Sequence, residues 1–533
     1  MNSLYVLPQQ KHFSYTAGQT VLQILQHHHL PIEAACGGHG TCGKCLIEII
    51  SGTVNPRTLE EENLSLPRQY RLSCQVYPQG DVTIRLPNTP VHDTIPIPST
   101  ASALKGSNAC TAYGVAIDIG TTTVVLTLVN MENQEICGTY THLNNQRAYG
   151  ADVLSRIAFA THEPTGLRQL HDAIIETITA GVLALCHQSA ILPSQLHQYV
   201  ISANTTMLHL LLQVSVATLG KAPYTPIFTT SQEVPASTLG LPGTADAAVY
   251  CLPGVSTFIG ADIVSGAVLA GLPKVKDTTV FLDMGTNCEI ILAKPDQMLA
   301  CSCAAGPALE GANIRCGMTA TPGAIDDVSL DSDGTLCVST IGQVSPQGIC
   351  GSGILAITAL FCQTGIISPR GRFRTRKEIT QSTYPSLGSY LVEDGKKRYF
   401  SLSHQDSSLY ITQQDIRQIQ LAKGAIAAGL RLLLETARLT PSDVDQVIIA
   451  GQFGQHMKAA YIAQIGLIPL EWQDKLTYIG NSSQLGAIQC LLHPALRQQM
   501  ETTATEIQYI DLSQRPDYER RFIQEMQFPE VKE

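Results

Sequence analysis

Several short stretches near the start of the chain alternate apolar with polar residues as strands do, or space them as helices do. Residues 3–8 and 11–16 predict a pair of strands, and residues 20–29 predict a helix whose end, a run of histidines, faces solvent. A strand, a short helix and a last strand are then expected at residues 45–50, 58–64 and 81–87. This order favours a β-grasp fold, which is an α+β domain.

Longer apolar stretches farther along predict a different architecture. Residues 113–130, YGVAIDIGTTTVVLTLVN, predict two strands around a short turn, and residues 280–290, VFLDMGTNCEI, repeat that arrangement. A buried strand and two helices are also expected, at residues 445–450, 258–272 and 478–492. Because Asp118 and Asp283 end similar strands 165 positions apart, the pattern indicates a duplicated α/β fold with two lobes.

The composition agrees with a large globular protein. A chain of 533 residues exceeds one ordinary domain, and 44% hydrophobic against 15% charged residues provides for packed cores. The net charge of -10 argues against nucleic acid as a partner, since binding a polyanion needs a basic surface. We recognise no secretory signal and no apolar run near the ~18 residues of a membrane span. We therefore expect a cytoplasmic protein without a membrane partner.

The 16 cysteines fall into two groups. Twelve are scattered from Cys110 to Cys490 in mostly apolar surroundings, and we expect them to be small buried side chains because disulfides are rare in the cytoplasm. The others have the spacing C-x5-C-x2-C followed by a distant cysteine, at Cys36, Cys42, Cys45 and Cys74.

The second group has the spacing of an iron–sulfur site. Structural zinc sites usually show two closely spaced pairs, whereas ferredoxins take three cysteines from one glycine-rich loop and a fourth from elsewhere. Since a Rieske centre needs two histidines, the lone His39 in the loop is expected to face solvent. The region from Cys36 to Cys74 resembles 2Fe-2S ferredoxin domains. The resemblance implies that the four cysteines hold a 2Fe-2S cluster.

Residues 88–112 are rich in proline, serine, threonine and alanine and lack any sustained period. We interpret them as a flexible linker between a ferredoxin-like domain, residues 1–87, and a second domain, residues 113–533. Fully extended, such a linker spans up to about 80 Å. A tethered ferredoxin could then move between an electron donor and an acceptor.

The turns of the two strand pairs carry residues suited to a nucleotide. Glycine lets the backbone approach a phosphate, threonine hydroxyls and amides donate to it, and a nearby aspartate can hold hydrated Mg²⁺. The first turn has Gly120, Thr121, Thr122 and Thr123 after Asp118, and the second has Gly285, Thr286 and Asn287 after Asp283, followed by Glu289.

Five segments resemble the superfamily of acetate and sugar kinase, chaperone and actin ATPases: 113–130, 258–272, 280–290, 445–454 and 478–492. The resemblance implies an actin-like ATPase with two RNase-H-like lobes that bind ATP and Mg²⁺. It implies that Asp118 and Asp283 bind Mg²⁺ through water and that the turn residues cradle phosphates. Gly451 and Gly454 are implied to lie beside the nucleoside.

The resemblance leaves two choices for the residue that orients the attacking water, Glu289 and Asp262. The simpler interpretations are that Glu289 is an ordinary strand carboxylate and that Asp262 caps the helix it opens.

The combination of both parts resembles one group, the ATP-dependent reductive activators of corrinoid proteins. Segments such as NNQRAYGADVLSRI (144–157) and AAGPALEGANIRCGM (304–318) look like the group's signatures. The resemblance implies an enzyme that reduces inactive cobalt(II) to cobalt(I) in a corrinoid methyltransferase system, such as an O-demethylase of anaerobes. It also implies a low-potential donor such as ferredoxin or flavodoxin, and a homodimer formed through the ATPase domain.

Two other functions remain open. An activator of the 2-hydroxyacyl-CoA dehydratase type would hold its cluster through cysteines of the ATPase part, such as Cys301, Cys303 or Cys350. A small-molecule kinase with a regulatory cluster would transfer phosphate to a metabolite, whereas an activator would release it.

Overall fold

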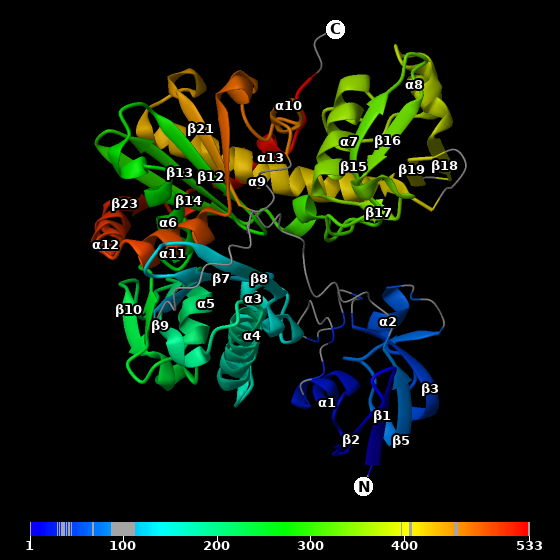
Figure 1. Ribbon diagram of the computed structural model, residues 1–533. Coiled ribbons are helices and arrows are strands. Elements are labelled where there is room, and N and C mark those ends of the chain that lie inside the picture. Colours follow the sequence, from blue (N-terminus) through cyan, green and yellow to red (C-terminus); the bar gives the residue numbers. More distant parts are fainter. Residues whose placement is uncertain are drawn as a thin grey trace. The chain divides into compact units, whose positions relative to one another are not determined.

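The computed structural model describes most of the chain: residues 2–28, 30, 32, 38, 40, 43, 45–64, 66, 69–86, 112–395, 397–403, 408–451 and 457–530 (Figure 1). The internal contacts divide the chain into two units. One comprises Met1–Ala261 and Ala487–Arg497, and the other comprises Asp262–Gly486 and Gln498–Glu533. The predicted linker, 88–112, lies outside the described residues except for Ala112.

The N-terminal part of the first unit is a five-stranded sheet with the order β2-β1-β5-β3-β4. β1 runs parallel to β5, and β3 runs antiparallel to it. The elements are β1 (Asn2–Leu7), β2 (Lys11–Tyr15), α1 (Val21–His27), β3 (Leu46–Val54), α2 (Leu59–Asn63), β4 (Tyr70–Leu72) and β5 (Pro78–Arg85). The predicted β-grasp fold is therefore confirmed, and the sequence missed only the short β4.

Local sequence explains why α1 covers this sheet. Thr20 caps the helix by accepting from the Gln23 backbone N–H, and the Gln23 side chain accepts from the Thr20 N–H in return. Ile24 and Leu25 are buried and pack with Val6 and other apolar residues of the strands. Burial of this apolar face, at about 25 cal/mol per Å², ties the helix to the sheet.

The rest of the first unit is a lobe around a six-stranded sheet with the order β10-β11-β9-β6-β7-β8. Its strands are β6 (Tyr113–Ile119), β7 (Thr123–Asn130), β8 (Ile136–Leu143), β9 (Leu196–Ala203), β10 (Gln232–Pro235) and β11 (Ala248–Cys251). Its helices include α3 (Val153–His162), α4 (Gly166–Gln188) and α5 (Thr205–Leu211). The predicted first strand pair is confirmed, because β6 and β7 pair antiparallel with Asp118 opposite Val125.

One helix among the described residues, α4, is long and apolar enough to cross a membrane. Half of its apolar window is buried within the lobe, where α4 contacts β7 and β8. A core helix of a folded lobe passes the same test of length and composition.

The second unit repeats the central part of this topology in a six-stranded sheet with the order β22-β21-β12-β13-β14-β23. The strands are β12 (Thr279–Met284), β13 (Cys288–Lys294), β14 (Gln297–Cys303), β21 (Gln446–Ala450), β22 (Leu476–Gly480) and β23 (Ile507–Tyr509). In both lobes an antiparallel meander of three strands has a parallel strand beside its first strand. The predicted duplication is thus confirmed as two RNase-H-like lobes.

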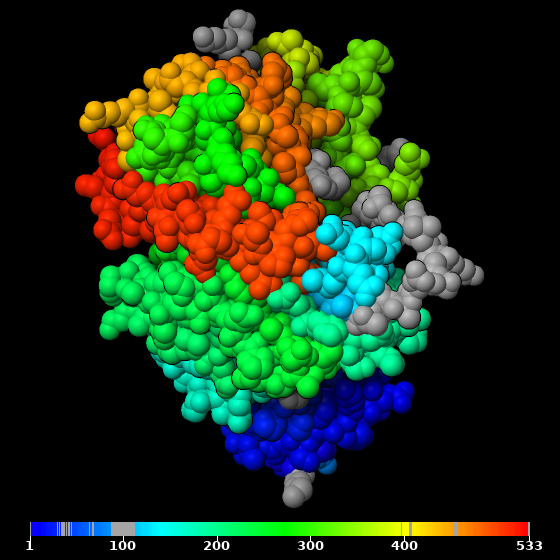
Figure 2. Space-filling model, turned by 60° about the vertical axis from the view of Figure 1, so that its left-hand side comes forward, coloured from blue at the N-terminus to red at the C-terminus, as the bar shows by residue number. Residues whose placement is uncertain are grey.

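Helices and two small sheets complete the second unit. Its helices are α7 (Gly351–Thr364), α8 (Arg376–Thr380), α9 (Gln413–Ala437), α10 (Ala459–Gln464) and α13 (Tyr518–Glu525), while α6 (Ala261–Leu269), α11 (Ser482–Leu492) and α12 (Leu496–Glu506) have residues in both units. The small sheets contain β15 (Ala324–Leu330), β16 (Leu336–Thr340) and β17 (Gly348–Ile349), and β18 (Leu391–Asp394), β19 (Lys397–Ser401) and β20 (Tyr410–Thr412). α7 and α9 are buried along most of their length and form the core with the large sheet. Figure 2 shows all atoms of one face of the molecule, coloured along the chain as in Figure 1.

Two expectations about local structure are confirmed. The helix predicted after Asn481 is confirmed, and the Asn481 side chain accepts from the Gln484 N–H as a cap does. The expectation that the scattered cysteines are mostly buried is confirmed for the described ones, although Cys137 and Cys316 are half-buried and Cys337 is exposed on β16. A small edge strand leaves this side chain without a covering layer.

Candidate functional site

Two of the predicted cluster ligands lie together in the ferredoxin-like part. The sulfurs of Cys45 and Cys74 are 3.4 Å apart, and both residues are buried beside Leu22 and Leu72. Two thiolates on one tetrahedral metal, each about 2.3 Å from it, lie about 3.8 Å apart. The donor set therefore fits a metal centre. Cys36, Cys42 and His39 lie outside the described residues.

The loop before Cys45 contains positions that require glycine. Gly38, Gly40 and Gly43 have φ values of +92°, +73° and +69°, which side chains with a Cβ rarely adopt. A Cβ on Gly40 would also lie 2.9 Å from the amide nitrogen of Gln75. That amide donates to the Cys74 sulfur at 3.8 Å, so glycine leaves room for a donor beside a predicted ligand.

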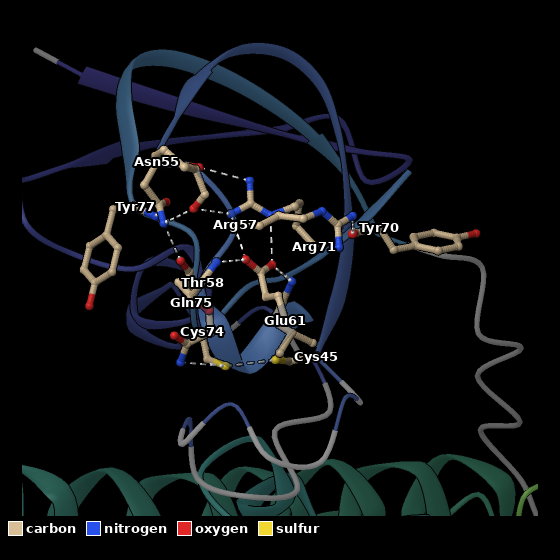
Figure 3. A network of polar contacts seen from close by, with 12 residues as sticks. Cys45, Asn55, Arg57, Thr58, Glu61, Tyr70, Arg71, Cys74, Gln75 and Tyr77 are labelled. Carbon is tan, nitrogen blue, oxygen red and sulfur yellow. Dashed lines mark hydrogen bonds and ion pairs between the residues drawn. The ribbon is translucent and has the colours of Figure 1, made fainter. Parts of the chain in front are cut away.

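A buried ion pair fixes the segment that carries Cys74 (Figure 3). Glu61 Oε1 accepts from Arg71 Nε at 2.8 Å and from the Leu72 N–H at 2.9 Å. Glu61 Oε2 accepts from Arg71 at 2.9 Å and from the Thr58 N–H at 3.1 Å. Burial alone would raise the pKa of Glu61, but Arg71 and the two backbone donors hold it below its usual range. Sequence reasoning missed this pair, which joins α2 to β4.

The first nucleotide hairpin lies in the lobe of the first unit. Its turn closes with the Gly120 N–H donating to the Thr123 carbonyl at 2.9 Å, while Asp118 lies half-buried on β6. Thr121 and Thr122 are half-buried as well, and the Asn204 amide donates to the Thr121 hydroxyl at 3.3 Å. The turn thus presents hydroxyls and backbone amides, as phosphate binding requires.

The second hairpin brings carboxylates together. Asp283 on β12 lies opposite Glu289 on β13, and Glu289 lies opposite Ser302 on β14, so all three share one face of the sheet. The Ser302 hydroxyl donates to Glu289 at 2.9 Å. The pKa of Glu289 is raised well above its usual value, first by burial and then by the charges of Asp262 and Asp283. Asp262, in the first turn of α6, is therefore close enough to act on Glu289.

Such a cluster of like charges favours a bound cation. Among the described residues, however, no three histidine, cysteine, aspartate or glutamate side chains are placed to hold a metal ion directly. Mg²⁺ commonly keeps several of its waters in proteins. The arrangement therefore fits a hydrated Mg²⁺ that the carboxylates contact through water.

The turn of the second hairpin has a partner that the sequence did not reveal. The Thr286 hydroxyl donates to Glu310 at 2.9 Å, and Glu310 lies in the segment 304–318 that was singled out without a role for this residue. Gly285 closes the turn by donating to the Asn287 carbonyl at 3.0 Å. The turn is therefore tied to a second loop.

Gly451 directly follows β21 and lies beside Asp283. Its φ is +94°, and a Cβ there would lie 2.6 Å from the Met284 carbonyl and 3.0 Å from Asp283 Oδ1. Glycine is thus required both by conformation and by space. Gly454 lies outside the described residues.

The cysteines of the second unit are poor cluster ligands. Cys301 and Cys303 are fully buried in the core, and burial raises the pKa of the Cys301 thiol well above its usual value. Cys350 is also buried and donates to the Ile325 carbonyl at 3.2 Å. The Cys301 thiol, kept protonated in an apolar core, disfavours a cluster at this position.

Comparisons with known families agree with these parts. Residues 4–79 match the model of a 2Fe-2S iron–sulfur cluster binding domain. Residues 113–275 match the model of the RACo middle region, and residues 277–533 match that of the C-terminal domain of RACo, the ASKHA domain. The first domain is therefore of the 2Fe-2S ferredoxin type, and the ASKHA match indicates an ATP- and Mg²⁺-dependent domain.

Three similar proteins are described as activators or reductases of corrinoid proteins. A solved structure of a reductive activator for a corrinoid, iron–sulfur protein matches with a TM-score of 0.70 and 28% identity, covering 100% of this chain and 99% of that one. The corrinoid activation enzyme RamQ of Eubacterium limosum is 36% identical over 380 residues, 70% of this chain and 63% of that protein. A Methanosarcina barkeri reductase of a Co(II) methylated amine-specific corrinoid protein is 24% identical over 403 residues, 70% of this chain and 68% of that protein.

Proposed function

Because the chain belongs to the RACo family, we propose that it is an ATP-hydrolysing activating enzyme that reduces the inactive cobalt(II) form of a corrinoid protein to cobalt(I). One observation carries the proposal. A 2Fe-2S domain and an ASKHA domain occur in one chain, which matches a reductive activator for a corrinoid, iron–sulfur protein along its whole length. The first domain would deliver the electron, and the second would supply the free energy of ATP.

The reduction needs this second input. When bound, a 2Fe-2S cluster supplies one electron at low potential, about -400 mV in plant-type ferredoxins. Transfer of that electron to cobalt(II) is thermodynamically unfavourable. Each 59 mV by which the cobalt potential lies below that of the cluster reduces the equilibrium constant about tenfold. A nucleotide shifts such an equilibrium only if it changes the affinity for the two states. The chain should therefore prefer the oxidised corrinoid protein, and the nucleotide state should change its relative affinity for the two cobalt forms.

Four cysteines are proposed to hold the cluster, namely Cys36, Cys42, Cys45 and Cys74. The 3.4 Å separation of the Cys45 and Cys74 sulfurs supports this assignment. The ion pair between Glu61 and Arg71 would keep β4, and with it Cys74, in register with Cys45.

Each hairpin is proposed to take part in nucleotide binding. Asp118 and Asp283 would each contact Mg²⁺ through water. The proposed phosphate-binding residues are Gly120, Thr121, Thr122, Thr123, Gly285, Thr286 and Asn287, with Gly451 and Gly454 beside the nucleoside. Either Glu289 or Asp262 would orient the attacking water. The raised pKa of Glu289 supports Glu289 as the group that accepts a proton, because a weaker acid is a stronger base.

The partners follow from the same chemistry. The proposed partners are a corrinoid protein of a methyltransferase system, such as an O-demethylase, and a low-potential electron donor such as ferredoxin or flavodoxin. A homodimer through residues 113–533 and a cytoplasmic location complete the proposal. Domain limits at 1–87 and 113–533, joined by a linker at 88–112, would let the ferredoxin part reach donor and acceptor in turn.

A direct experiment mixes the cluster-loaded chain, a reductant and a candidate corrinoid protein, and follows the absorbance change from cobalt(II) to cobalt(I) with and without ATP. We expect reduction that depends on ATP, with inorganic phosphate released in step. Reduction that is equally complete without ATP would contradict the proposal. Transfer of phosphate to a metabolite would instead support a kinase.

A further inference from the structure

The turn between β6 and β7 is fastened from one side by a buried cluster. The side-chain amide of Asn144 donates to the Gly120 carbonyl at 2.9 Å, and the Asn144 backbone N–H donates to the Thr122 carbonyl at 2.9 Å. Between them, the guanidinium of Arg156 on α3 donates to the Thr121 carbonyl. Two residues therefore hold three consecutive carbonyls of the turn.

Both residues belong to one polar cluster. Nη1 of Arg156 lies 3.1 Å from Gln146 Oε1 and 3.2 Å from Met207 Sδ. The Asn144 amide lies 3.4 Å and 3.9 Å from the same two atoms. Asn144 and Arg156 thus approach the turn from the same side.

The amides of the turn must then face the other side. In a planar trans peptide, the C=O of one residue and the N–H of the next point in opposite directions. Since the carbonyls of Gly120 and Thr121 point at the cluster, the N–H groups of Thr121 and Thr122 point away from it. Within the described parts of the chain, neither N–H has a hydrogen-bond acceptor. Two neighbouring backbone amides that point in the same direction can bind an anion.

A positive charge lies directly behind these amides. Arg156 is fully buried, and its other contact, from Nε to the Gly150 carbonyl at 2.9 Å, is also uncharged. None of the described residues that touch the guanidinium has a carboxylate. Burial lowers the pKa of Arg156 to about 9, while Arg147 and Asp152 act on it with opposite signs, so the group stays protonated at neutral pH. A buried cation without a counter-ion is costly unless an anion binds nearby.

We propose that Arg156 and Asn144 are positioning residues for the phosphates of ATP, which aim the N–H groups of Thr121 and Thr122 at the nucleotide and place a positive charge behind it. This inference rests on the proposed function, in which the chain binds MgATP. It assigns a role to segment 144–157, which carried no predicted site residue, and it makes α3 part of the nucleotide site without direct contact to the nucleotide.

The test compares binding of MgATP and of adenosine to the cluster-loaded full chain, by equilibrium dialysis. We expect Arg156→Met to weaken MgATP binding at least about tenfold. Without Arg156 the turn amides would no longer point at the phosphates, and a hydrogen bond to a charged group contributes about that much. Adenosine binding should change less than about twofold, and Arg156→Lys should recover at least half of the loss on a logarithmic scale. The matched control is Arg431→Met, which removes an exposed partner of Glu525 and should leave both ligands unaffected.

Equal losses of adenosine and MgATP binding, or a lysine variant no better than methionine, would overturn the inference. If Arg156→Met fails to fold, the wild-type chain labelled with ¹⁵N-threonine decides the matter. Addition of MgATP should shift the amide resonances of Thr121 and Thr122, and unchanged resonances would contradict the proposal. A wild-type chain that does not bind MgATP would refute the proposed function, whereas binding that survives Arg156→Met would refute only this inference.

Discussion

Replacement of Glu61 by glutamine is expected to destabilise the ferredoxin-like part strongly. The carboxylate accepts four hydrogen bonds, from Arg71 Nε and Nη2 and from the N–H groups of Leu72 and Thr58. Glutamine has the same shape but offers one oxygen, so a new donor faces two of the existing donors. It also leaves the guanidinium of Arg71, whose side chain is only 11% exposed, without its counter-charge.

The size of the effect follows from this geometry. Removal of one partner of a buried pair costs about 3–5 kcal/mol. With a urea dependence of about 1–2 kcal/mol per molar for a small domain, 3 kcal/mol lowers the midpoint by about 1.5–3 M. We would follow the visible absorbance of the cluster in the full chain during urea titration under anaerobic conditions, because this signal reports on the ferredoxin-like part alone.

Two further variants make the result decisive. Glu48→Gln removes an exposed pair with Arg85 in the same sheet and should cost at most about 1 kcal/mol. The double variant Glu61→Gln, Arg71→Met should be more stable than the sum of the single losses predicts, by at least about 1.5 kcal/mol, because the second change removes a charge already left unpaired. The reasoning fails if Glu61→Gln resists urea as well as Glu48→Gln does, or if the two single losses add.

Three other results are expected. Asp283→Ala should abolish ATP-dependent cobalt reduction and leave the cluster's visible spectrum intact; loss of the spectrum would mean that the two parts do not function separately. Cys74→Ser should lose iron, whereas Cys301→Ser should keep full iron content by chemical assay, and the opposite pattern would move the cluster to the second unit. Lys423 is buried on α9, and burial lowers its pKa to about 8. Between about pH 8 and 10.4 the unfolded chain therefore binds more protons at this residue than the folded chain, so its contribution to the free energy of unfolding should rise with pH. Urea midpoints from the fluorescence of Trp472, the single tryptophan, should shift in favour of wild type over Lys423→Met as pH rises from 8 to 10; a constant difference would contradict the low pKa.

The features predicted from sequence are those encoded over short distances. Alternating apolar residues and a glycine turn suffice for each hairpin, because the partner strand follows at once, so Asp118 and Asp283 could be placed at strand ends in advance. Repetition of that signal identified two lobes. Cys36, Cys42, Cys45 and Cys74 could be grouped because cysteine spacing on a glycine-rich loop is itself a local signal, and the structure adds that Cys45 and Cys74 are neighbours.

The supports of these sites depend on contacts between distant residues, which no local period encodes. Arg156 reaches the Thr121 carbonyl, Glu310 reaches Thr286 and Glu61 pairs with Arg71 only after helices and loops have packed against the sheets. Glu289 has the sequence of an ordinary strand carboxylate, and its raised pKa arises from burial and from Asp262 on a separate helix. The local order of residues along the chain thus determined which chemical groups are available. Tertiary packing decided their burial, their charged neighbours and the direction in which they point, since these depend on the distances between segments.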